Sequence, residues 1–198
     1  MDVIISQELV DLQESDLLVL GFFQDEKPLR GSTGWIDWRL NGRLSRFLIQ
    51  NRFRGEWMER VLIPSEGRIA PRLILLLGLG RTREYSYLVV RELVASILDV
   101  VKNLKASHLS FSLPYGEEYK VDCDKLTAVL IESLVDRLDR HPSDREWIEN
   151  LTLSFGEGEE RFSDILFGAQ TARALLKDRL KIRLLTPSHP QDKPPPPV

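Results

Sequence analysis

The chain has 198 residues, of which 42% are hydrophobic and 29% are charged, and its formal net charge at pH 7 is −3. This length and composition are typical of one soluble domain with its own hydrophobic core. Because acidic and basic residues are mixed along the chain, the charge argues against general binding to nucleic acid. No apolar run approaches the length of about 20 residues that spans a bilayer, so we expect no membrane association.

The start of the chain and its cysteine content indicate the compartment. Residues 1–5 read Met-Asp-Val-Ile-Ile and lack the basic start and apolar segment of a signal peptide. Cys123 is the only cysteine, so it has no partner for an internal disulfide. The sequence therefore predicts a cytoplasmic protein in a reducing compartment.

The first half of the chain places strands around one helical segment. The block Leu17-Leu18-Val19-Leu20 is typical of a strand that is buried on both faces. A helix is expected to begin at Ser32 or Thr33, although Gly34 and Gly42 lie inside it and weaken it. The predicted elements are strands at Val3–Leu12, Asp16–Phe23, Trp57–Pro64 and Arg72–Leu77, a helix from about residue 32 to 51, and a turn at Glu66-Gly67.

The second half contains the most regular helical pattern. Val90, Val94, Ile97 and Val101 recur at steps of four and three, which is the spacing of one buried helical face. The predicted elements are helices at Tyr85–Lys105, Lys125–Arg140 and Phe162–Leu185, and strands at His108–Leu113 and Trp147–Phe155.

Strands that alternate with helices predict one three-layer α/β domain, in which helices flank a mixed, mostly parallel sheet. The two opening strands have no helix between them, which allows an antiparallel edge. We expect this domain to cover residues 1–186. Residues 187–198 contain six prolines and too little apolar surface to pack a core, so they are expected to form a disordered, proline-rich tail.

Two segments resemble the N-terminal domain of the leucyl (cytosol) aminopeptidase family. They are Asp16–Phe23, which reads DLLVLGFF, and Arg72–Gly80, which reads RLILLLGLG. On the helix that follows, Arg91–Ser96 stands where the family carries arginine and small residues. The resemblance covers about residues 12–155. It implies a macro-domain-like fold, a role in oligomer assembly, and a role in shaping access to a neighbouring catalytic domain.

The chain departs from this family in the residues that carry its chemistry. The metal motif Asn-Thr-Asp-Ala-Glu-Gly-Arg and the Lys-Gly and Asp-Ser-Gly-Gly segments have no counterpart in the 198 residues. Asp122 and Asp124 fit helix caps better than metal ligands, and His108, His141 and His189 share no ligand spacing. No catalytic or metal-binding residue is carried over, and we expect no enzyme activity, no metal and no cofactor.

Gly78, Gly80, Arg81 and Arg83 form a candidate anion or ligand site. They follow a buried strand and precede a helix, where free backbone N–H groups and the helix dipole favour an anion. A tight turn that needs glycine is the simpler alternative, because the third glycine of a dinucleotide fingerprint is missing. In a macro-like domain, the loop Pro114-Tyr115-Gly116 would line the same pocket.

Tryptophans and arginines in the predicted helix from residue 32 to 51 form a candidate partner surface. Such side chains dominate the binding energy of many protein interfaces, although tryptophans also pack in cores. A strip of arginines between residues 39 and 54 also fits phosphate, but a solvated helix face or a subunit contact fits it better. The candidate residues are Trp35, Trp38, Arg39, Arg43 and Arg46.

The sequence therefore favours a non-catalytic interaction or regulatory module that associates with itself, as a homo-oligomer, or with a protein partner. Two alternatives remain open. One is a macro-like binder of ADP-ribose or another phosphorylated small molecule. The other is an accessory subunit of a metallo-aminopeptidase that is encoded on a separate chain.

Overall fold

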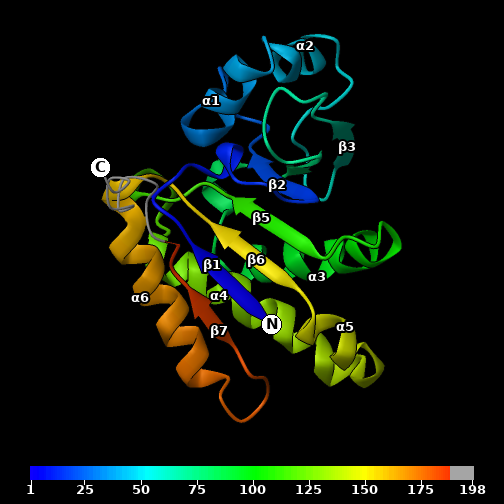
Figure 1. Cartoon of the computed structure of the whole chain (residues 1–198). Helices are drawn as coiled ribbons and strands as arrows, with labels where there is room; N and C mark the ends of the chain where they lie inside the picture. Colours follow the sequence, from blue (N-terminus) through cyan, green and yellow to red (C-terminus); the bar gives the residue numbers. More distant parts are fainter. Residues whose placement is uncertain (188–198) are drawn as a thin grey trace, which may run out of the picture.

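The computed structural model describes residues 1–187 (Figure 1). The predicted tail, residues 187–198, lies outside the described residues except for Pro187. One seven-stranded sheet has the order β3-β4-β2-β5-β6-β1-β7. The strands are β1 (Asp2–Ile5), β2 (Leu17–Phe22), β3 (Arg60–Pro64), β4 (Leu73–Gly78), β5 (His108–Ser112), β6 (Thr152–Phe155) and β7 (Arg183–Leu185). The helices are α1 (Gly31–Arg39), α2 (Arg43–Ile49), α3 (Tyr87–Asn103), α4 (Cys123–Arg140), α5 (Arg145–Glu149) and α6 (Glu159–Leu175).

The sheet is mixed and mostly parallel, as predicted. Every strand pair is parallel except β3–β4, in which Leu62 lies opposite Leu75. The antiparallel strand is therefore β3 at one edge. The opening strands β1 and β2 are both parallel members, and two other strands, β5 and β6, separate them in the sheet. Pro64, which has no backbone N–H to donate, ends the edge strand β3, where a missing donor costs least.

Helices cover the sheet on two sides, which confirms the predicted three-layer α/β domain (Figure 1). Leu17 and Val19 of β2 pack into the larger core beneath α3, α4 and α6. Leu18 and Leu20 point the opposite way and pack in a second core with α1 and α2. Successive side chains in a strand alternate between faces, so burial on both sides explains the uninterrupted apolar run of β2.

The single helix that the sequence predicts from residue 32 to 51 is two helices in the structure. Asn41 and Gly42 have positive φ angles of 57° and 71°, which break the helix. Asp37, near the end of α1, accepts hydrogen bonds from the backbone N–H groups of Leu44 and Ser45 at 2.7 and 3.2 Å. One buried carboxylate therefore caps the second helix and fixes the angle between the two.

Four other predicted elements differ from the structure by three or more residues at one end or both. The strand predicted at Val3–Leu12 ends at Ile5, and a 3-10 turn follows at Val10–Leu12. β3 begins at Arg60 rather than Trp57. The strand predicted at Trp147–Phe155 is the short helix α5 followed by β6.

The helix predicted at Phe162–Leu185 ends at Leu175, and the chain returns as strand β7. β7 pairs with the outer edge of β1, and the Arg183 guanidinium lies 2.6 Å from the Asp2 carboxylate. A strand at this position satisfies backbone groups of β1 that a continued helix would leave unpaired.

Candidate functional site

The chain leaves two neighbouring parallel strands in opposite directions. From β2 it passes through α1, α2 and β3 to β4 on one side, whereas from β5 it passes through α4 and α5 to β6 on the other. Figure 1 shows α1 at the carboxyl end of β2, apart from the helices behind β5 and β6. In open α/β sheets, connections that diverge in this way leave a crevice at the carboxyl ends of the strands.

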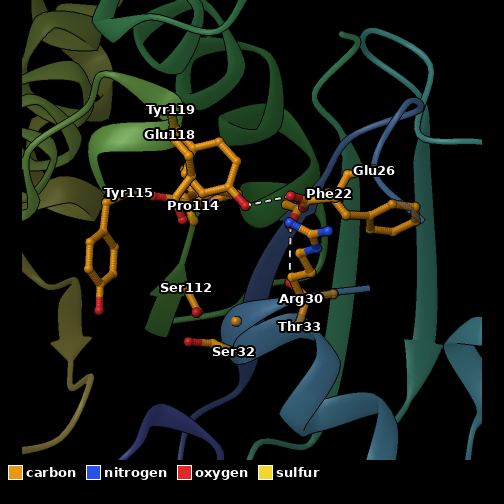
Figure 2. A pocket seen from close by; sticks show the side chains of 13 residues that line it. Phe22, Glu26, Arg30, Ser32, Thr33, Ser112, Pro114, Tyr115, Glu118 and Tyr119 are labelled. Atoms are coloured by element: carbon orange, nitrogen blue, oxygen red, sulfur yellow. Dashed lines mark hydrogen bonds between the residues drawn. The ribbon is translucent and has the colours of Figure 1, made fainter. Parts of the chain in front are cut away.

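A cavity of about 190 Å³ lies at this crevice (Figure 2). The end of β2, the start of α1 and the loop after β5 each supply part of its wall. The lining residues are Gly21, Phe22, Glu26, Arg30, Gly31, Ser32, Thr33, Ser112, Leu113, Pro114, Tyr115, Glu118 and Tyr119.

The start of α1 brings backbone donors to the cavity. Within residues 1–187, the N–H groups of Gly31, Ser32 and Thr33 have no backbone acceptor, and no side chain caps the helix. The Thr33 hydroxyl donates instead to the carbonyl of Gly21, at 3.1 Å, and ties α1 to β2. The first N–H groups of a helix and its dipole favour an anion, so this wall of the cavity is electropositive.

The opposite wall is acidic. The hydroxyl of Tyr119 donates to the Glu26 carboxylate at 2.7 Å, and burial together with that carboxylate raises the pKa of Tyr119. Figure 2 shows the Arg30 side chain reaching toward this pair. Glu118 supplies a second carboxylate to the lining. The lining side chains therefore combine one guanidinium with two carboxylates, and their net negative charge opposes the attraction of the helix start for an anion.

Glu157, the second residue after β6, joins the elements around the cavity. Its carboxylate accepts hydrogen bonds from the hydroxyls of Ser32, at 2.5 Å, and Ser112, at 2.8 Å. Burial raises its pKa, and the two hydroxyls oppose that rise. Glu157 thus fixes the start of α1 against the end of β5. Sequence reasoning missed this residue, and its position two residues after the end of a predicted strand was the available signal.

The predicted anion site at Gly78, Gly80, Arg81 and Arg83 lies outside the cavity lining. The N–H groups of Gly78, Leu79 and Gly80 donate to the carbonyls of Glu59, Phe22 and Gly55 at 2.8, 3.0 and 3.0 Å.

The helix after this turn, which the sequence predicts from Tyr85, begins at Tyr87 as α3, so the turn does not lie at the N-terminus of a helix. Anion binding at the turn stays a prediction, but the backbone donors on which it relies already serve the fold. Pro114 and Tyr115 do line the cavity, opposite the start of α1 instead of the glycine turn.

The candidate partner surface divides into exposed rings and arginines that serve the fold. Trp35 and Trp38 of α1 are 54% and 70% exposed, and their ring centroids are 5.5 Å apart. Arg39 forms an ion pair with the buried Asp11. Arg43 donates to the carbonyl of Pro64, and Arg46 donates to the carbonyl of Asn41.

Neither a metal cluster nor a membrane helix occurs in the part of the chain that the structure describes. No group of three or more His, Cys, Asp or Glu side chains in residues 1–187 is placed to hold a metal ion. None of the helices over the same residues is long and apolar enough to cross a membrane.

Solved structures share the fold. A Trypanosoma brucei macrodomain in complex with ADP matches with a TM-score of 0.61 and 16% identity over 82% of this chain and 66% of that chain. A mutant Oceanobacillus iheyensis macrodomain with ADPR matches with a TM-score of 0.59 and 16% identity over 89% of this chain and 92% of that chain. A mutant tomato leucine aminopeptidase matches with a TM-score of 0.54 and 16% identity, over 89% of this chain but 37% of that chain.

Sequence relatives agree with the leucine aminopeptidase match. A probable cytosol aminopeptidase of Cyanothece sp. is 29% identical over 131 residues, and one of Synechocystis sp. is 26% identical over 153 residues. The chain spans 27% and 30% of the lengths of these two relatives. The model of the cytosol aminopeptidase family, N-terminal domain, matches residues 19–140, which is more than half of the chain. This chain therefore belongs to the cytosol aminopeptidase family and matches the N-terminal domain of that family.

Proposed function

We propose that this chain is a non-catalytic association module whose α1 face binds a second copy of the chain. The pair of tryptophan rings on α1 carries the proposal. Trp35 and Trp38 are 54% and 70% exposed and lie in contact with each other. Burial of such a ring against a partner stabilises a complex by about 2 kcal/mol or more, so two adjacent rings form the core of an interface.

The helix that carries these rings is held rigidly. Thr33 and Ser32 bond to the Gly21 carbonyl and to Glu157, and Arg39 pairs with Asp11. A surface that is already ordered loses little conformational freedom when it binds, which favours association. An exposed ring on a mobile loop would lack these contacts and would lose more conformational freedom on binding.

A binding role is proposed over a chemical one because the residues that carry the family's chemistry are not among these 198. The match is to the N-terminal domain of cytosol aminopeptidases, and the chain spans 27% and 30% of two relatives. The metal motif of the family has no counterpart in the 198 residues. Assays with leucyl-p-nitroanilide and Mn²⁺ or Zn²⁺ are therefore expected to show no metal-dependent hydrolysis. Metal-dependent turnover that disappears on substitution of the chain's own acidic residues would contradict this part of the proposal.

Replacement of Trp38 by serine is expected to weaken self-association by about tenfold or more, because it removes the more exposed ring of the pair. Size-exclusion chromatography with light scattering over a series of concentrations measures the effect. Phe167→Ser is the matched control, because Phe167 is a 61% exposed aromatic side chain on α6. Equal weakening by both substitutions, or a monomeric wild type at all concentrations, would contradict self-association through α1. A separate metallo-aminopeptidase chain that binds the wild type but not the Trp38 variant would instead support the accessory-subunit alternative.

The cavity at the carboxyl ends of β2 and β5 supports a second function, the binding of a phosphorylated small molecule. Three open N–H groups and Arg30 favour a phosphate group there, and the macrodomain structures named above include complexes with ADP and ADPR. This function ranks second for two reasons. The cavity, about 190 Å³, is smaller than the roughly 300 Å³ of typical ligand pockets, and Glu26 and Glu118 face an incoming anion.

The second function predicts that Arg30→Gln weakens the binding of ADP-ribose by about tenfold, since a charge-assisted hydrogen bond is lost. Isothermal titration calorimetry with ADP-ribose and with inorganic phosphate measures this change. Lys120→Gln, which removes an exposed positive charge from a residue outside the cavity lining, serves as the control. The absence of binding by the wild type would remove this function without affecting association through α1.

A further inference from the structure

A second concave site lies between α2 and the turn that joins β3 to β4. Its volume is about 410 Å³, roughly twice that of the cavity described above. Leu40 and Phe47 supply its apolar surface, and the turn supplies Glu66 and Arg68. The complete lining is Leu40, Arg43, Arg46, Phe47, Gln50, Arg52, Glu66 and Arg68. We refer to these residues as the arginine groove.

The charge of the arginine groove contrasts with that of the chain. Four guanidinium groups and one carboxylate line it, whereas the whole chain has a formal net charge of −3. A concave surface with several like charges concentrates the electrostatic potential and attracts ions of the opposite sign. The arrangement therefore points to a multivalent anion.

The four arginines fall into two pairs with different roles. Arg43 donates to the Pro64 carbonyl at 3.0 Å and pairs with Glu66 at 3.0 Å, and Arg46 donates to the Asn41 carbonyl at 2.9 Å. The fold therefore orients these two groups. Within residues 1–187, the Arg52 and Arg68 side chains make no hydrogen bond or ion pair, and both residues are exposed. Their guanidinium donors are available to a ligand.

We propose that the arginine groove binds a compact oligophosphate anion, such as a triphosphate chain that is free or belongs to a nucleotide. The planar fork of a guanidinium group matches two phosphate oxygens at once, and several forks that converge favour a chain of phosphates over a single one. The only aromatic ring in the groove, Phe47, has the Arg43 guanidinium 5.8 Å from its centre and offers no free platform for a base. Recognition therefore rests on the phosphates.

The groove shares Arg43 and Arg46 with the candidate partner surface, but it is separate from the tryptophan pair that carries the association proposal and from the other candidate sites. Neither Trp35 nor Trp38 lines the groove, and neither Arg30 nor the Gly78–Arg83 turn contributes to it. A Trp38→Ser variant is expected to keep oligophosphate binding, so failure of one proposal leaves the other standing.

Isothermal titration calorimetry with inorganic tripolyphosphate tests the proposal, and ATP and AMP are titrated in parallel. We expect tripolyphosphate and ATP to bind with similar affinity and AMP to bind at least about tenfold more weakly, because it lacks the phosphate chain. The double variant Arg52→Gln/Arg68→Gln is expected to weaken tripolyphosphate binding by about a hundredfold, since it removes two charge-assisted contacts.

The matched control is Arg140→Gln/Arg173→Gln, which removes the same charge from two exposed arginines outside the groove and outside the other candidate sites. It is expected to change the affinity for tripolyphosphate by less than about twofold, because salt screens charges that lie far from the bound anion. Equal losses in both double variants would show general electrostatic attraction and overturn the proposal. No binding of tripolyphosphate by the wild type, or tighter binding of a DNA duplex than of tripolyphosphate, would also overturn it. Thermal melts of both variants check that the fold is intact.

Discussion

Replacement of Asp144 by asparagine is expected to lower the free energy of unfolding by about 3 kcal/mol, because it leaves the buried Arg137 guanidinium with only the exposed carboxylate of Asp99 as a charged partner. The Asp144 side chain is 3% exposed and accepts from Lys102 Nζ and Arg137 Nε, both at 2.5 Å. The Arg137 side chain is only 9% exposed. Asp144 directly precedes α5, so its carboxylate ties that helix to Lys102 of α3 and Arg137 of α4. The Trp147 ring of α5 lies 5.9 and 5.7 Å from the same two cations.

The matched control for this prediction is Asp99→Asn. Asp99 contacts the same guanidinium, at 2.7 Å, but its side chain is 75% exposed, and its removal is expected to cost less than about 1 kcal/mol. Urea unfolding at neutral pH measures both variants. Similar losses for the two substitutions would contradict the account of a buried ion pair.

The same pair predicts a pH dependence. Hydrogen bonds from Lys102 and Arg137 hold the pKa of Asp144 below its ordinary value. A carboxyl with a lowered pKa stabilises the fold above its unfolded pKa of about 4, and this contribution is lost as the pH falls through the folded value. The stability difference between wild type and Asp144→Asn is therefore expected to stay constant from neutral pH to about pH 5 and to shrink only in stronger acid.

Replacement of Gly168 by valine is expected to lower the free energy of unfolding by about 3 kcal/mol or more. Gly168 lies in α6 where that helix crosses the start of α4. A Cβ atom there would lie 2.1 Å from the carbonyl oxygen of Asp124 and 3.0 Å from Thr127 Cβ. The blocking atom belongs to the backbone, so the two helices must move apart.

Alanine at the same position separates packing from helix propensity. In an exposed helix, alanine stabilises by about 1 kcal/mol relative to glycine, whereas here the contact with α4 opposes that gain. The expected order of stability is glycine, then alanine, then valine. Gln170→Val, at an exposed position of the same helix, is the control and is expected to change stability by less than about 1 kcal/mol. A more stable Gly168→Ala variant would show that α6 does not pack closely against α4.

The sequence predicted best the elements whose side chains repeat with one clear period. Val90, Val94, Ile97 and Val101 are all buried on α3, as their spacing indicated. The apolar runs of β2 and β4 are buried across their whole length or nearly so, because both faces of these central strands are covered. In these elements, local preference and tertiary packing agree.

The elements that the sequence did not predict depend on partners far along the chain. β7 forms because the edge of β1, about 180 residues away, is open to it. The break between α1 and α2 had a local signal, since Asn41-Gly42 is a pair that favours positive φ. The spacing of hydrophobic residues continues through this pair, because both helices face the same core. The spacing by itself therefore predicted one helix.

The candidate site was predictable only in part for the same reason. Strand order decides which loops meet, and single residues do not encode strand order. Pro114 and Tyr115 were expected beside a ligand pocket, and in the structure they line the cavity at the carboxyl end of β2. The start of α1 supplies the other wall because β2 and β5 are neighbours in the sheet. Glu157 reaches Ser32 and Ser112 because β6, which precedes it, also lies beside β5.

Hydroxyl-radical footprinting with mass spectrometry at low and high protein concentration tests self-association through α1 most directly, because it measures the solvent exposure of individual side chains. If the α1 face binds a second copy, oxidation of Trp35 and Trp38 will fall as concentration rises. Oxidation of Phe167 on α6 and Leu88 on α3, which are 61% and 72% exposed, will stay constant. Unchanged oxidation of the two tryptophans at concentrations where light scattering detects a dimer would place the interface elsewhere and contradict the account.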